Sequence, residues 1–211
     1  MTIEYLDLIA NDVLTQLSSE NINIFAKDQI NRELIHAKDV LKWLLVINPN
    51  SSFEVQTAAL LHDCERIIDR GDKTVSYKGD RKSQDYIEHK KQHALRSSEL
   101  AKEMLNQRSI STNQQERIYW LILHHDDTGE NLRALKDDEL DNLVSADSFS
   151  FFTSIARNML DREGKDRVKD KSTFMMNKIP KRLLEVLQIF QIEDVEIEQI
   201  KNEVISKFFN K

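Results

Sequence analysis

The stretch VQTAALLHDCERII, residues 55–68, combines an apolar helical face with two ionisable side chains. His62 follows Ala58 and Ala59 at four- and three-residue spacing, which places its imidazole on the stripe that a helix buries. Asp63 stands beside it, and no glycine or proline interrupts the stretch. We therefore predict a helix that carries a histidine and an aspartate into the protein core.

The rest of the chain shares this helical character. Its 211 residues include 4 glycines and 2 prolines, whereas average usage would give roughly fifteen and eleven. This scarcity argues against a β-sandwich, a β-barrel or a glycine-rich phosphate loop. Apolar residues at three- and four-residue spacing predict an all-α protein with about eight helices. The predicted helices span residues 2–18, 29–47, 52–68, 85–106, 113–125, 137–161, 172–190 and 193–209.

Length and composition predict one domain. With 40% apolar and 31% charged residues, the chain can bury a sizeable core. We expect residues 1–211 to form a single domain whose core covers about 30–160. An N-terminal helix and C-terminal helices would pack on that core.

Charge and composition exclude several classes of protein. The net charge of −6 argues against general nucleic-acid binding and against an acidic membrane partner. A single cysteine, Cys64, excludes an intrachain disulfide and suits a reducing compartment. The opening MTIEYLDLIANDVL is acidic where a signal peptide would be basic, and no stretch approaches ~18 apolar residues. We expect a cytoplasmic protein.

All six histidines lie within residues 36–125. His36, His93 and His125 each lie on the apolar face of a predicted helix, with apolar residues four or seven positions away. Asp147 occupies another such face, where a lone carboxylate would be costly to bury. These positions bring ionisable groups from several helices towards the core.

Taken singly, each buried histidine is most simply a hydrogen-bonded core residue. Together, four imidazoles and two carboxylates need a partner that offsets their burial, and a divalent metal ion provides one. Imidazole and carboxylate ligands without thiolate suit one or two ions among Mn, Fe, Co, Ni, Zn or Mg. His89 lies in the charged run EHKKQ, and we expect it to be solvated.

The order and spacing of these residues resemble the HD superfamily of metal-dependent phosphohydrolases, over about residues 30–160. The family-like stretches are AALLHD (58–63), HALRSSELAKEML (93–105), LILHHDDTG (121–129) and SADSFSFF (145–152). The layout is particularly close to HD proteins that cleave diadenosine tetraphosphate and to HD-GYP phosphodiesterases, although no GYP follows the paired histidines. The resemblance implies a compact, multi-helix HD-domain bundle.

The resemblance also implies two metal sites. The ligands of the first would be His36, His62, Asp63 and Asp147. Asp63 would bridge to a second ion held by His93 and by His124, His125 or both. Helical periodicity favours His125 as the inward member of that pair. Water activated by the ions would attack phosphorus, without a protein nucleophile.

Three further residues are candidate catalytic groups because of their neighbours. Glu65 and Arg66 follow the His-Asp pair closely enough to support a ligand or to hold phosphate. Asp126 stands beside His125, where it could orient the imidazole or accept a proton. We expect all three to act at the metal site.

Two basic stretches could draw in a phosphorylated substrate. The first spans residues 70–91, with a net charge of +3 from seven basic and four acidic side chains. It includes Lys90 and also Arg81 and Lys82, our candidate substrate-binding residues. The second spans residues 166–182, with a net charge of +4 from six basic and two acidic side chains. Either stretch can equally be a solvated surface.

We expect a metal-dependent phosphohydrolase that acts on a small phosphate ester or anhydride, most simply a nucleotide. Three alternatives stay open: an HD-fold oxygenase with a diiron pair, a catalytically silent sensor that binds nucleotide or metal, and a purely structural helical protein. The apolar stripe Leu183, Leu184, Leu187, Ile189 and Phe190 predicts helix packing or a homodimer surface.

Overall fold

The computed structural model describes residues 24–67, 83–108 and 110–209. The predicted helix 2–18, most of the predicted irregular segment 69–84, and both Arg81 and Lys82 lie outside these ranges. Within them, all regular secondary structure is helical, which confirms the all-α fold class. No helix in the described ranges is both long and apolar enough to cross a membrane.

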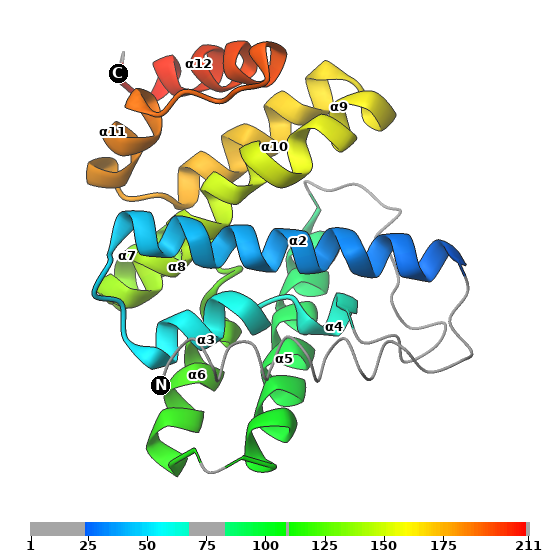
Figure 1. Ribbon diagram of the computed structural model, residues 1–211. Coiled ribbons are helices and arrows are strands. Elements are labelled where there is room, and N and C mark those ends of the chain that lie inside the picture. Colours follow the sequence, from blue (N-terminus) through cyan, green and yellow to red (C-terminus); the bar gives the residue numbers. More distant parts are fainter. Residues whose placement is uncertain (1–23, 68–82, 109, 210–211) are drawn as a thin grey trace. The chain divides into compact units, whose positions relative to one another are not determined.

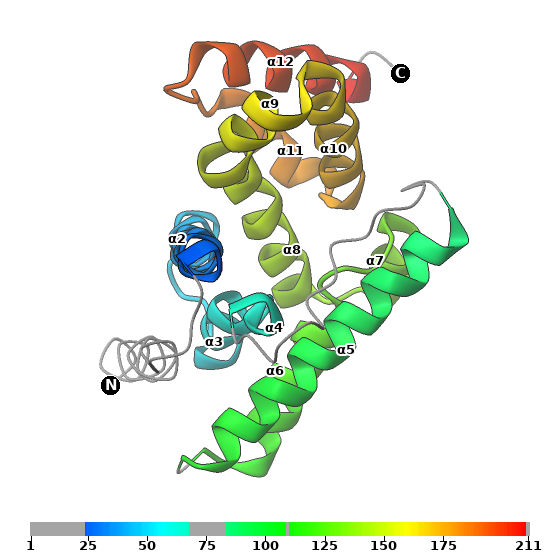
Figure 2. The ribbon, with the colours of Figure 1, turned by 90° about the vertical axis from the view of Figure 1, so that its right-hand side faces the viewer.

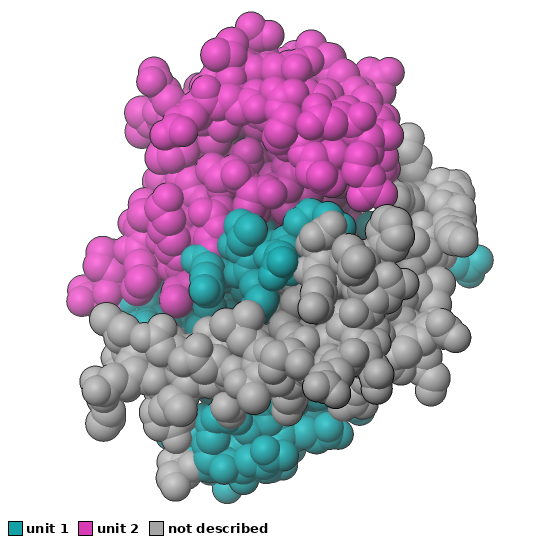
Figure 3. Space-filling model, turned by 45° about the vertical axis from the view of Figure 1, so that its right-hand side comes forward, with its two compact units in different colours: residues 1–38, 51–126 teal, residues 39–50, 127–211 magenta. Residues whose placement is uncertain are grey.

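The chain divides into two compact units, which Figure 3 shows in different colours. Unit 1 comprises residues 1–38 and 51–126, and unit 2 comprises residues 39–50 and 127–211. Helix α2 (Ile24–Ile47) contributes its residues up to Lys38 to unit 1 and the remainder to unit 2. Each unit buries apolar side chains of its own. The single domain expected from the sequence stays a prediction.

In unit 1, four helices follow the first part of α2. They are α3 (Phe53–Leu61), α4 (Cys64–Ile67), α5 (Gln84–Asn106) and α6 (Thr112–His124). The hydroxyls of Ser52, Ser83 and Ser111 accept hydrogen bonds from backbone N–H groups in the first turns of α3, α5 and α6. Such caps satisfy donors that a helix itself leaves unpaired. Helices α5 and α6 lie side by side (Figure 2).

The predicted helix 52–68 is interrupted at the residues that carry its chemistry. His62 and Asp63 form a turn between α3 and α4. His62 Nδ1 lies 2.9 Å from the carbonyl oxygen of Ala59, which would accept the Asp63 N–H in a continuous helix. The His62 side chain thus competes with the Asp63 N–H for this carbonyl oxygen. Apolar periodicity does not indicate such a local competition.

Unit 2 continues from the second part of α2 through a series of helices coloured from green to red in Figure 1. They are α7 (Gly129–Leu135), α8 (Asp138–Ser150), a π-helical segment (Phe151–Ile155), α9 (Ala156–Glu163), α10 (Lys165–Lys178), α11 (Lys181–Ile189) and α12 (Val195–Phe209). The sequence prediction missed α7 and the π-helical segment. It also joined α10 to α11 across Pro180, whose ring lacks the N–H of a helix interior.

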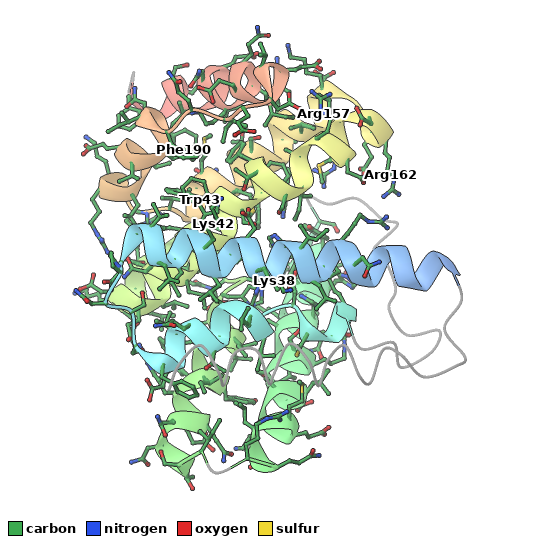
Figure 4. The ribbon with its side chains drawn as sticks, in the orientation of Figure 1. Lys38, Lys42, Trp43, Arg157, Arg162 and Phe190 are labelled. Carbon is green, nitrogen blue, oxygen red and sulfur yellow. The ribbon has the colours of Figure 1, made fainter. Side chains whose placement is uncertain are left out.

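Aromatic packing joins three segments of unit 2. The Trp43 ring lies edge-on to Phe149 and Phe190, with ring centroids 5.2 and 4.4 Å apart, and Figure 4 labels Trp43 and Phe190. Trp43 Nε1 donates a hydrogen bond of 3.0 Å to Thr153 Oγ1. Aromatic pairs of this geometry add to the free energy gained from burial.

The predicted apolar stripe of the C-terminal half has two parts. Leu183, Leu184 and Leu187 are buried, which confirms their role in helix packing. Ile189 is 80% exposed in this chain, so it adds nothing to that packing. The homodimer stays a prediction.

Gly129 sets the distance between α7 and the end of α10. A Cβ atom at this position would lie 2.2 Å from the carbonyl oxygen of Asn177, which is closer than real Cβ contacts. The backbone of α7 can approach α10 because residue 129 has no side chain.

We expect Gly129→Ala to lower the free energy of unfolding by roughly 1–3 kcal/mol, because the two backbones must separate. Thermal unfolding followed by circular dichroism measures this loss. Asn131→Ala, on the exposed side of the same helix, is the matched control and should change the midpoint little. Equal midpoints for Gly129→Ala and the wild type would show that α7 does not pack this closely.

Candidate metal centre

Three buried side chains of unit 1 converge on one point. Asp63 lies in the turn between α3 and α4, His93 lies on α5, and His125 follows the last residue of α6. One ligand atom of each lies within 4.8 Å of the other two. His93 Nε2 and His125 Nε2 lie 2.7 and 3.6 Å from the same oxygen, Asp63 Oδ1.

The second nitrogen of each imidazole is fixed by an acceptor. His93 Nδ1 lies 2.6 Å from Glu65 Oε2, and His125 Nδ1 lies 2.6 Å from the carbonyl oxygen of Ile122. If each Nδ1 carries the proton for these bonds, each Nε2 presents a lone pair to the Asp63 carboxylate. Facing acceptors repel unless a cation, either a proton or a metal ion, lies between them. Ligand histidines in proteins are commonly fixed through their other nitrogen in this way.

Charge in the group is concentrated on Asp63 and His93. Burial acts to raise the pKa of Asp63, but Arg66, then His62 and His93, outweigh it and hold this pKa well below its ordinary value. Burial and Arg66 act to lower the pKa of His93, whereas Asp63 and Glu65 raise it, and the net shift is upward. The site therefore favours an ionised carboxylate and a cation beside it.

Glu65 and Arg66 are both in contact with the group, as the sequence predicted for their positions. Arg66 Nη1 lies 2.6 Å from Asp63 Oδ2. Glu65 joins His93 to Arg96, whose Nε donates to the second carboxylate oxygen of Glu65. Glu65 therefore orients the His93 ring, and Arg66 fixes the carboxylate of Asp63.

His36 and His62 continue the row of imidazoles. His62 lies edge-on to His125 on one side and to His36 on the other, with ring centroids 5.1 and 5.3 Å apart. Both rings are buried in unit 1. His62 brings a further imidazole nitrogen close to Asp63, since its Nε2 lies 3.8 Å from Asp63 Oδ2.

Asp147 belongs to unit 2. It lies on α8, is buried, and places Oδ2 at 4.0 Å from Lys178 Nζ. Its predicted place in a ligand set with His36 and His62 stays a prediction. Within unit 2, the nearby ammonium offsets part of the cost of burying this carboxylate.

The remaining two histidines do not belong to the group of Asp63. His124 is half-buried and packs against Trp120, with ring centroids 4.8 Å apart. The inward member of the pair is thus His125, as periodicity indicated.

His89 stacks on Tyr86 and is half-buried. Its burial, followed by the nearby His93 and Arg96, lowers its pKa. The expected solvation of His89 is therefore incomplete.

Sequence reasoning missed the role of Lys90, which it placed among the exposed basic residues. Lys90 is buried and forms an ion pair with Asp126 Oδ2, which lies 3.7 Å from His125 Nε2. Burial acts to lower the pKa of Lys90, but Asp126 outweighs it and raises this pKa, so the ammonium stays charged. The signal in the sequence is spacing, because Lys90 precedes His93 by three residues and shares its helix face.

The donor atoms fit a divalent ion. Asp63, His93 and His125 supply carboxylate oxygen and imidazole nitrogen, the ligands that suit Mn, Fe, Co, Ni and Zn in catalytic sites. The thiol of Cys64 lies 3.3 Å from the carbonyl oxygen of Ser97, to which it donates. The group is thus a candidate metal centre without thiolate ligands.

Comparisons with known proteins identify no relative: no family model, curated protein or solved structure gives a significant match to this chain. The chemistry of the centre is therefore argued from its side chains.

We expect the purified protein, once chelated and dialysed, to bind Mn²⁺ or Co²⁺ in isothermal titration. Asp63→Ala should weaken the tightest site by about 100-fold or more, since it removes the oxygen on which both imidazoles converge. Glu65→Gln should weaken it roughly tenfold by loosening His93. His124→Ala, the matched histidine outside the group, should bind as the wild type does. Wild-type affinity in Asp63→Ala would show that these residues hold no metal.

Proposed function

We propose that this protein is a metal-dependent phosphohydrolase of HD type that acts on a small phosphate ester or anhydride, most simply a nucleotide. The proposal is carried by the convergence of His93 Nε2 and His125 Nε2 on Asp63 Oδ1, with Arg66 and Lys90 beside them. A divalent cation satisfies the facing acceptors, and the neighbouring side chains supply positive charge for an anionic substrate.

Asp63, His93 and His125 would hold one ion. As the resemblance to HD proteins implies, His36, His62 and Asp147 would hold another ion, and Asp63 would contribute to both sites. A divalent ion bound there supplies Lewis acidity towards water and towards phosphoryl oxygens. The ring nitrogens stay in place because Glu65, Ile122 and Ala59 each fix the Nδ1 of one imidazole.

The charge balance around the centre favours an anionic ligand. Three carboxylates at the centre each contact a cation: Asp63 contacts Arg66, Glu65 contacts Arg96, and Asp126 contacts Lys90. Arg66 also lies 3.9 Å from Glu33. Imidazoles that bind an ion are neutral, so Glu33 and Asp147 would offset part of the charge of the bound ions and the rest would stay uncompensated within the protein. A phosphate group then supplies the missing negative charge.

Lys90 and Arg66 are the residues best placed to hold phosphoryl oxygens. Arg66 is the more open of the two, with 37% of its side chain exposed, and its guanidinium can form paired hydrogen bonds with phosphate. Lys90 is held next to the centre by Asp126. Asp126 thus acts as a positioning residue for the Lys90 ammonium, in addition to its contact with His125.

The decisive experiment combines metal analysis with a screen for phosphate release. The full chain is loaded with Mn, Co, Ni, Fe, Zn or Mg and offered nucleotides, dinucleoside polyphosphates and sugar phosphates. We expect phosphate or nucleotide monophosphate release with at least one ion, and loss of release in Asp63→Ala. Oxygen consumption with iron and no phosphate release would instead support the diiron oxygenase. Tight nucleotide binding without turnover would support the sensor.

A second prediction concerns Lys90. We expect Lys90→Met to lower kcat/KM by about 100-fold, because it removes a cation that faces the transferring phosphoryl group. Its affinity for Mn²⁺ should not fall, since Lys90 is not a ligand. The exposed neighbour Lys91→Met is the matched control and should keep wild-type turnover. The double variant Lys90→Met/Asp126→Asn removes both charges, and full activity in it would contradict a role for the ammonium.

A further inference from the structure

Unit 2 contains a cavity of about 540 Å³. Its walls come from the end of α7, the end of α10, the start of α11, and single residues of α8 and α12. Every lining residue in the described part of the chain belongs to unit 2. We therefore treat the cavity as a feature of this unit.

The lining of the cavity is strongly basic. Among its described lining residues, four are cationic and one, Asp141, is acidic. The cations are Arg133, Lys136, Lys178 and Lys181. Burial raises the pKa of Asp141, although Arg182 at 3.8 Å acts in the opposite direction. Because Lys178 lies 4.0 Å from the carboxylate of Asp147, the other three cations set the balance. Positive charge then exceeds negative charge by about two units when Asp141 is ionised, and an anion is the natural counterpart.

The same cavity has apolar walls. Leu132, Met176 and Phe208 contribute to its lining. Its volume lies in the range typical of sites for small organic ligands and is larger than a bare phosphate ion requires. A ligand that combines phosphate with an apolar or aromatic part would use both the cations and these walls.

Lys136 provides a second, independent observation. It ends α7 with φ 52° and ψ 48°, and among the described residues it is the one non-glycine residue with positive φ. Glycine or asparagine usually occupies this position at the end of a helix, because a side chain there costs about 1–2 kcal/mol. A lysine in a strained backbone conformation that also lines a cavity points to a role for its side chain.

The walls around Lys136 are held in place by close contacts. Gly129 allows the backbone of α7 to approach the carbonyl oxygen of Asn177, and Arg133 Nη1 donates to the same oxygen at 3.4 Å. Lys178 is 3% exposed, with Nζ at 4.0 Å from Asp147 Oδ2. The helix ends that carry these cations are therefore held in place. Ligand binding then requires little further ordering of the backbone.

We propose that this cavity binds a phosphorylated small molecule, with Lys136 and Lys181 contacting the phosphate and the apolar wall contacting the remainder. The site is separate in composition from the candidate metal centre, since it includes none of that centre's residues. Its occupancy does not depend on a metal ion or on phosphate hydrolysis.

The test uses adenosine monophosphate as the probe, titrated calorimetrically into the full chain in EDTA. Lys136→Gly is the informative variant, because it removes the side chain and relieves the backbone. We expect roughly tenfold weaker binding, as for loss of one charged hydrogen bond, together with an unchanged or higher thermal midpoint. Lys181→Ala should weaken binding similarly. Arg162→Ala on α9, labelled in Figure 4, is the control and should bind as the wild type does.

Further ligands separate the phosphate from the apolar contribution. Adenosine should bind more weakly than adenosine monophosphate, because it lacks the anion, and inorganic phosphate should also bind more weakly. The proposal fails if adenosine monophosphate does not bind in EDTA, if adenosine binds as tightly, or if Lys136→Gly keeps wild-type affinity. Repeating the titration in Asp63→Ala excludes the metal centre as the source of binding, so this result is independent of the proposed hydrolysis.

Discussion

The buried carboxylate of Asp63 is the constraint on which the centre of unit 1 depends. It accepts contacts from Arg66 and from the Nε2 atoms of His93 and His125, which come from three separate helical elements. A carboxylate buried without such partners would be neutralised or would destabilise the fold. The turn after α3, helix α5 and the end of α6 all contact this one ionised group. If the group holds a metal ion, its need for cations would link folding to metal binding.

The surroundings of this group follow a simple electrostatic pattern. Glu65 and Asp126 are each held by a cation, Arg96 and Lys90 respectively, so the protein balances its own buried charges in pairs. A metal ion bound at the proposed centre would keep part of its charge, which a phosphate would then meet. Buried pairs of this kind add little net stability. Their value here lies in holding imidazoles and cations in fixed positions around Asp63.

Unit 2 uses a different arrangement for positive charge. Its cavity collects cations from helix ends, where Gly129 allows a close approach and Lys136 adopts a left-handed conformation. Around the centre of unit 1, Arg66, Arg96 and Lys90 each contact a carboxylate, whereas the described lining of the cavity has four cations and one acid, Asp141, with Lys178 also near Asp147. On the two proposals above, the first site would attract phosphate through a bound metal ion. The second would do so without one.

The sequence by itself determined the all-α class, most helix positions and the burial of His36, His62, His93, His125 and Asp147, because these depend on local periodicity and on the scarcity of glycine and proline. The tertiary structure decided what depends on contacts between distant residues. It paired Lys90 on α5 with Asp126 in the turn after α6. It also gathered Lys136 and Lys181 around one cavity. These pairings depend on which helices pack against one another, which the periodicity of a single helix does not specify. The break at His62 is local, but it arises from a side-chain hydrogen bond that apolar periodicity does not indicate.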